Sequence, residues 1–141
     1  MHTLEGFAAA CHQILTEQPG RKGREQVCAL LQQVLEDDAF VSAHLTDDTP
    51  ERKILYEDPQ LGFCILAHVY RTARESAPHD HGHSWAIYGQ ARGETVMSDW
   101  SVVELEIQTA MAAPSCATAT SLSITAPGMA GAVAGALQVP L

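Results

Sequence analysis

Residues 78–89 read PHDHGHSWAIYG and carry three of the seven histidines of the chain within five positions. If the stretch is extended, side chains alternate between two faces, so His79 and His81 point the same way with α carbons ~6.6 Å apart. At that spacing two imidazoles can share one metal ion. His83 lies on the same side only if the strand stays regular through Gly82. The stretch therefore predicts a metal site, against the alternative that polar loop residues cluster here.

Length and composition limit the kind of protein. The chain has 141 residues, of which 46% are hydrophobic and 18% charged, and its formal net charge is -9. That length is typical of one domain with its own core, so we expect a single globular unit. An acidic surface repels phosphate backbones, and we therefore expect no nucleic-acid partner.

The cysteines and the chain ends bear on location. Cys11, Cys28, Cys64 and Cys116 are widely spaced and form no Cys-x-x-Cys pair, so we expect reduced and mostly buried thiols. The first residues lack a basic segment followed by a long apolar run, and the uncharged C-terminal region lacks a clean apolar span of about 20 residues. We expect a cytoplasmic protein with neither a secretory signal nor a membrane partner.

The first 46 residues have the pattern of helices. Apolar side chains recur at helical spacing over 4–18 and, more strongly, over 24–36, with a Pro-Gly stop signal between the two ranges. A third, shorter helix is predicted to begin at Asp37 or Asp38, either of which can cap it. We expect His44, on the inner face of this helix, to be a packing residue rather than a metal ligand.

After residue 50 the hydrophobic period changes to that of strands. Residues 52–56 and 62–71 are predicted strands with a turn at Asp58 between them. The second strand is almost continuously apolar, which predicts burial on both of its faces. His68 interrupts it and is either a hydrogen-bonded core histidine, the commoner situation, or a group that reaches the metal from a neighbouring strand.

The histidine stretch is predicted to continue as a strand through Tyr88. A glycine-flanked turn is expected over 89–93, followed by a strand over 94–100. Glu104 and Glu106 then alternate with apolar residues, which predicts a half-buried strand with its charges in water.

Residues 107–141 break with the composition of everything before them. They contain no Asp, Glu, Lys, Arg or His and are rich in Ala, Ser, Thr, Gly and Pro. We expect a disordered or weakly structured tail over 108–141, with a short strand over 121–125 as the alternative. The expected organisation is a helical segment over 1–46, a β domain over 50–107 and this tail. The abrupt change raises the hypothesis that the tail is not the natural continuation of the domain, which the other reading frames of the encoding DNA would test.

Residues 24–106 resemble the cupin superfamily, whose fold is a double-stranded β-helix or jelly roll. The resemblance rests on the sequence RKILY over 52–56, the strand over 62–71, the run His79-Asp80-His81-Gly82, and the downstream Trp85 and Gly89. It is closest to cysteine dioxygenase-like and related thiol dioxygenase-like metal enzymes. It implies a mainly β fold of the α+β class, an incomplete cupin-type jelly roll preceded by two to three N-terminal helices.

The same resemblance implies roles for particular residues. His79 and His81 would bind one Fe(II), or another divalent metal. Arg52 stands where such enzymes place an arginine that clamps the substrate carboxylate, a task that suits a bidentate guanidinium. Tyr88 would shape the catalytic pocket.

The third metal ligand is missing from its expected place. The resemblance puts a histidine on a later strand, but no histidine follows His83. Candidates within the chain are, in falling order, His83, Glu94, His68 and Cys116. Otherwise the chain carries a defective site.

The resemblance implies a non-haem iron dioxygenase that uses O₂ on a small thiol or carboxylate-bearing substrate. One rival interpretation is a cupin-type module that binds a metal or a small molecule without turnover. Another is a truncated, inactive relative, whose unpaired strand edges favour association of copies of the chain into a homo-oligomer.

Overall fold

The computed structural model describes residues 1–72, 84–93, 102–103, 106–107, 119–127 and 136–139. Three helices come first: α1 (Leu4–Glu17), α2 (Arg21–Leu35) and α3 (Asp38–His44). They confirm the three helical ranges predicted from the apolar spacing, although α2 begins three residues before the predicted position 24. Asp37 rather than Asp38 caps α3, because its side chain accepts hydrogen bonds from the backbone N–H groups of Ala39 and Phe40.

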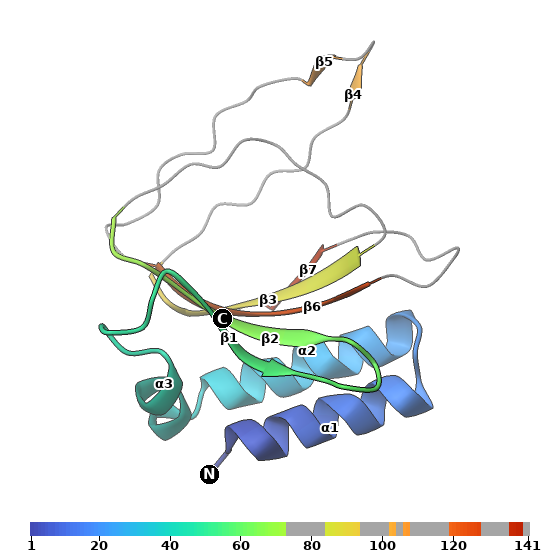
Figure 1. Ribbon diagram of the computed structural model, residues 1–141, viewed down its shortest axis with the longest axis horizontal. Coiled ribbons are helices and arrows are strands. Elements are labelled where there is room, and N and C mark those ends of the chain that lie inside the picture. Colours follow the sequence, from blue (N-terminus) through green and yellow to red (C-terminus); the bar gives the residue numbers. More distant parts are fainter. Residues whose placement is uncertain (73–83, 94–101, 104–105, 108–118, 128–135, 140–141) are drawn as a thin grey trace.

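A sheet of five strands follows in the order β1-β2-β6-β3-β7 (Figure 1). The strands are β1 (Arg52–Glu57), β2 (Cys64–Tyr70), β3 (Ser84–Arg92), β6 (Ala119–Pro127) and β7 (Ala136–Val139). The first four in that spatial order pair antiparallel, and β7 is parallel to β3. Two short strands, β4 (Val102–Val103) and β5 (Glu106–Ile107), pair with each other. The fold belongs to the α+β class.

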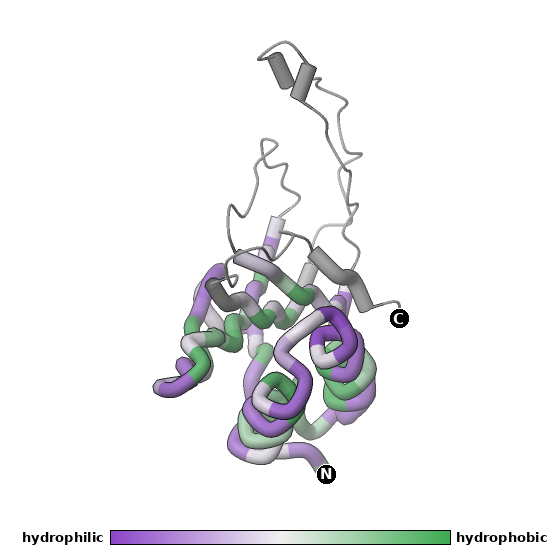
Figure 2. The backbone as a smooth tube through the Cα atoms, turned by 90° about the vertical axis from the view of Figure 1, so that its right-hand side faces the viewer, coloured by the Kyte–Doolittle hydropathy of each residue, from purple (hydrophilic) through white to green (hydrophobic). Residues whose placement is uncertain are grey.

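The helices cover one face of the sheet, and the core lies between the two layers (Figure 1; Figure 2). Alternate residues of β2, β3 and β6 point into this layer, because successive side chains of a strand point to opposite faces. They meet the apolar faces of α1, α2 and α3 there. The strand residues of this core include Ile65, Ala67, Trp85, Ile87, Leu122 and Ile124.

At Gly89 the sheet lies in close contact with α2. A Cβ atom at this position would lie 2.5 Å from Leu35 Cδ1 and 2.8 Å from Leu31 Cδ2, both on α2. The missing side chain therefore lets α2 pack directly on β3. The neighbouring Trp85 is buried in the same layer, with the Arg24 guanidinium 6.0 Å from the centre of its ring.

The turn between β1 and β2 is built around the buried Asp58. Its two carboxylate oxygens accept hydrogen bonds from the backbone N–H groups of Gln60 and Leu61 and from the Tyr56 hydroxyl, and Oδ1 lies 2.9 Å from His12 Nδ1 on α1. Gly62 adopts a φ of 75° here, a value that favours glycine. The predicted turn at Asp58 is thus confirmed. Through the contact between Asp58 and His12, the turn also binds the β1-β2 hairpin to α1.

The structure corrects two expectations about the second half of the chain. The turn predicted over 89–93 is wrong: β3 runs on to Arg92, with an irregularity between Gln90 and Arg92, and only Gly93 has a positive φ, 74°. The tail does not lack structure throughout, because β6 covers the alternative strand over 121–125 and lies at the centre of the sheet between β2 and β3. Its Leu122 and Ile124 are fully buried, which explains why the segment is held in the sheet.

None of the helices within the described ranges is both long and apolar enough to cross a lipid bilayer.

Candidate functional site

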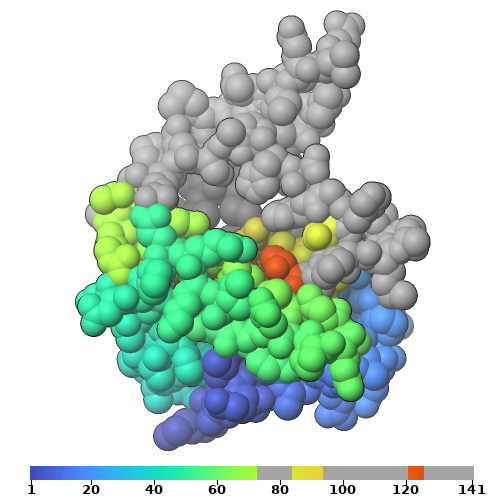
Figure 3. All heavy atoms as spheres, viewed as in Figure 1, coloured from blue at the N-terminus to red at the C-terminus, as the bar shows by residue number. Residues whose placement is uncertain are grey.

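The sheet face that points away from the helices contains a cavity of about 320 Å³. Three neighbouring strand pairs contribute to it, because β1, β2, β6 and β3 lie side by side in that order. The space-filling view shows atoms of β6 and β3, in orange and yellow, above the green β1-β2 hairpin (Figure 3). The residues that line the cavity are Arg52, Leu66, His68, Ser84, Tyr88, Ser123 and Thr125.

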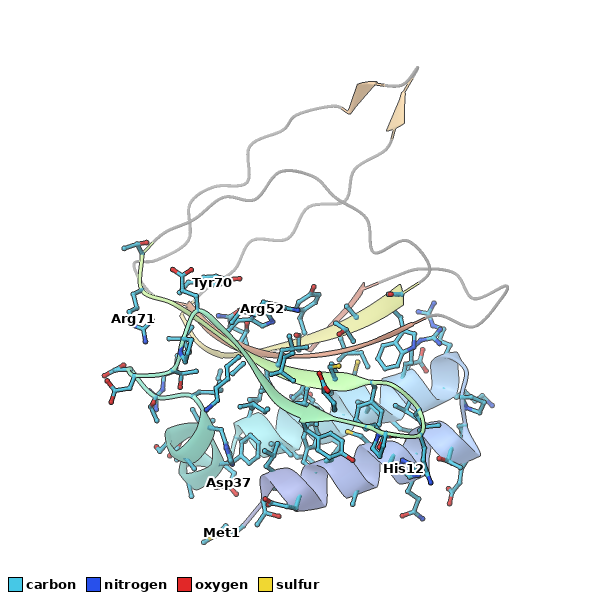
Figure 4. All side chains as sticks on the ribbon, viewed as in Figure 1. Met1, His12, Asp37, Arg52, Tyr70 and Arg71 are labelled. Carbon is cyan, nitrogen blue, oxygen red and sulfur yellow. The ribbon has the colours of Figure 1, made fainter. Side chains whose placement is uncertain are left out.

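Strand register places the polar members of this lining opposite one another. Arg52 on β1 is the direct partner of His68 on β2, and Tyr88 on β3 is the direct partner of Ser123 on β6. The Arg52 side chain projects from the sheet on the side away from the helices (Figure 4). The pairing shifts by one residue between Ile54 and Tyr56, so Arg52 shares the face of His68 whereas Tyr56 packs on the helix side against Phe63.

His68 is half-buried in the wall of the cavity. Its Nε2 lies 2.8 Å from Ser123 Oγ on the adjacent strand, while its buried Nδ1 has no hydrogen-bond partner among the described residues. Burial of the ring is the main cause that lowers the pKa of His68 below its ordinary value of 6.5, and the positive charge of Arg52 lowers it further. The imidazole is therefore neutral at neutral pH, with one nitrogen bonded to Ser123 and the other without a partner in the described part of the chain.

Two tyrosines stand beside His68. Tyr70 stacks on the imidazole with ring centres 6.2 Å apart, and its side chain rises from the same face as Arg52 (Figure 4). Burial, and then the neighbouring Tyr70, raise the pKa of the Tyr88 hydroxyl above 10.0, so this phenol stays protonated and can donate a hydrogen bond.

The structure brings together three residues that the sequence analysis named separately. Arg52, Tyr88 and His68 all line the one cavity, although they are far apart in the chain. His79, His81, His83, Glu94 and Cys116 lie outside the described residues. The serines and the threonine of the lining were missed, since isolated hydroxyl side chains in strands carry no distinctive sequence signal. For Ser123 and Thr125, however, the alternation of hydroxyl and apolar residues over 121–125 predicts a common face.

Among the described residues that line this cavity, His68 is the histidine that could bind a metal ion. The other histidines of those ranges, His2, His12 and His44, belong to the helical layer, where His44 packs on Phe40 with ring centres 4.7 Å apart. No group of three or more potential metal ligands occurs within the described ranges. One imidazole, with Nε2 bonded to Ser123 and Nδ1 buried, does not make a metal site, so the iron prediction rests on the histidines outside the described residues.

A second group of titratable side chains lies in the opposite layer. His12, Tyr56 and Asp58 join α1 to the β1-β2 turn, and Figure 4 shows His12 beside that turn. Burial raises the pKa of Asp58, but the hydrogen bonds from Leu61, His12, Tyr56 and Gln60 together bring it below its ordinary value of 3.8. Both oxygens of the Asp58 carboxylate have hydrogen-bond partners, so this group links α1 to the β1-β2 turn and stabilises the fold.

Comparison of the chain with protein families, with curated proteins and with solved structures finds no match.

Proposed function

We propose that the chain is a mononuclear metal-dependent enzyme of cupin type, a non-haem iron dioxygenase that acts on a small thiol or carboxylate-bearing substrate. The observation that supports this proposal best is the cavity of about 320 Å³ on the open face of the sheet. It joins Arg52, His68 and Tyr88, the described residues that the sequence analysis connected with substrate or metal. A volume of this size suits a small molecule.

Arg52 would bind the acid group of the substrate. It is the permanent cation of the lining, and no carboxylate is among the described residues that form the cavity. Its guanidinium can give two parallel hydrogen bonds to one carboxylate. The protonated Tyr88 hydroxyl would hold a polar atom of the substrate from the β3 side, and Leu66 would contact its apolar part.

The metal would be held by His79 and His81, with His83 or His68 as the third ligand. Fe(II) held by these residues would supply the redox chemistry that the activation of O₂ needs. Ser123 and Tyr88 would orient the substrate by hydrogen bonds, and the apolar Leu66 would keep part of the cavity free of water.

The alternative function is a cupin-type module that binds a metal or small acid without turnover. The same polar cavity supports it, since such binding needs only Arg52 and its neighbours. The two functions differ in O₂ consumption when a thiol is supplied.

Oxygen uptake by the iron-loaded protein tests the proposal. A small thiol with a carboxylate should support O₂ uptake, and Arg52→Ala should raise KM for it by about 10- to 100-fold, because a charge-assisted bidentate contact contributes roughly 1.5–3 kcal/mol. Lys53→Ala is the matched control, since Lys53 belongs to a different pocket near α3. Stoichiometric metal without any O₂ uptake would instead favour the binding module.

A further inference from the structure

The strand β1 forms one edge of the five-stranded sheet, with β2 on one side and no described strand on the other. A strand in this position presents unpaired N–H and C=O groups, to which another strand can bond. Arg52, Lys53 and Ile54 of β1 are exposed, and the green hairpin of β1 and β2 is uncovered on the side that faces the viewer (Figure 3). The outer edge of β1 is therefore accessible to a partner.

Exposed apolar side chains gather on the same hairpin. Apart from the terminal Met1, the large hydrophobic residues exposed in the described part of the chain are Ile54 on β1, 46% exposed, and Leu61 in the following turn, 38% exposed. A single exposed apolar residue is ordinary, but two on the hairpin that also has the free edge indicate a contact surface. Removing them from water would favour association.

The charges of β1 are arranged in an order that suits pairing with a second copy of the chain. The strand begins with Arg52 and ends with Glu57, and neither side chain forms an ion pair within the described part of the chain. Charges on an edge strand oppose pairing unless each meets an opposite charge. When two copies of β1 run antiparallel, the start of each strand meets the end of the other, so each Arg52 meets a Glu57.

The two faces of the sheet select the same register. Arg52 lies on the open face with its partner His68, which lines the cavity there. Glu57 lies on that face as well, since its partner Cys64 is an even number of positions from His68 along β2. Residues directly opposite each other in paired strands share a face, as Arg52 and Glu57 do. A shift by one residue would set Arg52 against Tyr56, which packs on the helix side.

We propose that the outer edge of β1 binds the same edge of a second copy of the chain, antiparallel and about a two-fold axis, so that the two sheets join into one. Two Arg52–Glu57 contacts flank the axis, and the Ile54 side chains of both copies lie beside it. The irregularity between Ile54 and Tyr56 falls at the axis and affects both strands alike. Such a contact is isologous, because the same residues contribute from both copies.

This dimer requires neither a metal nor a substrate, so it is independent of the proposed function. It is also compatible with the cavity. The guanidinium of Arg52 has five N–H donors, so it can meet Glu57 of the second copy and still bind an acid group in the cavity.

Sedimentation velocity of the purified protein over a range of concentrations tests the proposal. The wild type should show a reversible equilibrium between monomer and dimer. Arg52→Glu and Glu57→Arg should each weaken dimerisation by about tenfold or more, because the two-fold axis repeats every repulsive contact. The double variant Arg52→Glu/Glu57→Arg should regain most of the wild-type affinity, since opposite charges meet again with their places exchanged.

Glu17→Arg is the matched control, because it makes the same change of charge at an exposed position of α1 and should dimerise like the wild type. Hydrogen exchange of the wild type needs no variant to fold: peptides from β1 should exchange more slowly at high than at low protein concentration. A monomer at every concentration, a dimer that neither single substitution weakens, or exchange of β1 that is independent of concentration would overturn the proposal.

Discussion

Asp58 carries a full charge although only 1% of its side chain is exposed. Two backbone N–H groups, the Tyr56 hydroxyl and the His12 ring surround its oxygens. A carboxylate buried with this many donors stabilises the fold as long as it stays ionised, because each donor would otherwise be left without a partner. The sequence identified Asp58 as a turn residue, but the contact with His12, 46 positions away, depends on how α1 packs.

Asp58→Asn should lower the free energy of unfolding by about 1.5–3 kcal/mol at pH 7, the range for hydrogen bonds to charged groups. The pKa of Asp58 is lowered in the folded state, so its contribution is fully present above its ordinary value of 3.8 and is lost as the pH falls through the lower folded value. Urea unfolding across acidic pH measures this loss, which should be absent in the variant.

Asp48→Asn is the control for this change, because Asp48 is exposed in the loop before β1. Its effect should stay within about 0.5 kcal/mol. Equal effects of the two substitutions would contradict the role assigned to Asp58.

His68 shows where sequence reasoning at the level of a residue stops. A single histidine in an apolar strand is either a core residue or a functional one, and the sequence left both interpretations open. The structure supplies the cross-strand partner Arg52 and the hydrogen bond to Ser123, both of which depend on register. Register is a long-range property, so no local pattern around His68 contains it.

Elements near the N-terminus were predictable because their patterns are local. The helical spacing over the first 46 residues and the strand pattern of β1 and β2 each recur within one segment, and tertiary contacts reinforce them. The central strand β6 was predicted only as the alternative short strand over 121–125, because its low charge and small side chains resemble a weakly structured segment. Its place between β2 and β3 arises from pairing with strands far earlier in the chain, from Arg92 with Thr120 to Cys64 with Thr125.

At the level of elements, the contact between α2 and β3 gives a direct test of packing. Gly89→Ala should destabilise the protein by about 1–3 kcal/mol, because the new methyl group would overlap the side chains of Leu31 and Leu35, which must shift within the packed core. Thermal unfolding followed by circular dichroism measures the change.

Gly20→Ser provides the matched control. Nothing lies within 4 Å of a Cβ at Gly20, and serine is a favoured residue at the N-cap of a helix such as α2. A wild-type melting temperature for Gly89→Ala would contradict the close approach of α2 to the sheet.

For the whole molecule, Cys11 reports on the integrity of the helical layer. Burial raises the pKa of this thiol to about 12, and its side chain is fully inaccessible in the core. The reactive thiolate is therefore both scarce and covered. Cys28 and Cys64 are only partly buried.

Alkylation by iodoacetamide at pH 8 should modify Cys28 and Cys64 while Cys11 stays protected until the protein unfolds. Mass spectrometry of digested protein over a range of urea concentrations measures each rate. Rapid labelling of Cys11 in the absence of denaturant would show that the helices do not close over the sheet as described.

The proposed site combines the cavity on the open face of the sheet with His79, His81 and His83, which lie outside the described residues. The sequence predicts a metal site from His79 and His81, and the cupin resemblance implies that Arg52 binds an acid group; both stay predictions. That Arg52, His68 and Tyr88 line the same cavity depends on the pairing of β1, β2, β6 and β3, which the sequence does not reveal.

Iron content of the purified protein is the most direct test of the central claim that this is a metal-dependent enzyme. After anaerobic loading with Fe(II) and removal of excess metal, the wild-type protein should retain about one iron per chain, and His79→Ala and His81→Ala should each lose most of it. Retention of the same amount of iron by both variants, or no retention by the wild type, would contradict the account.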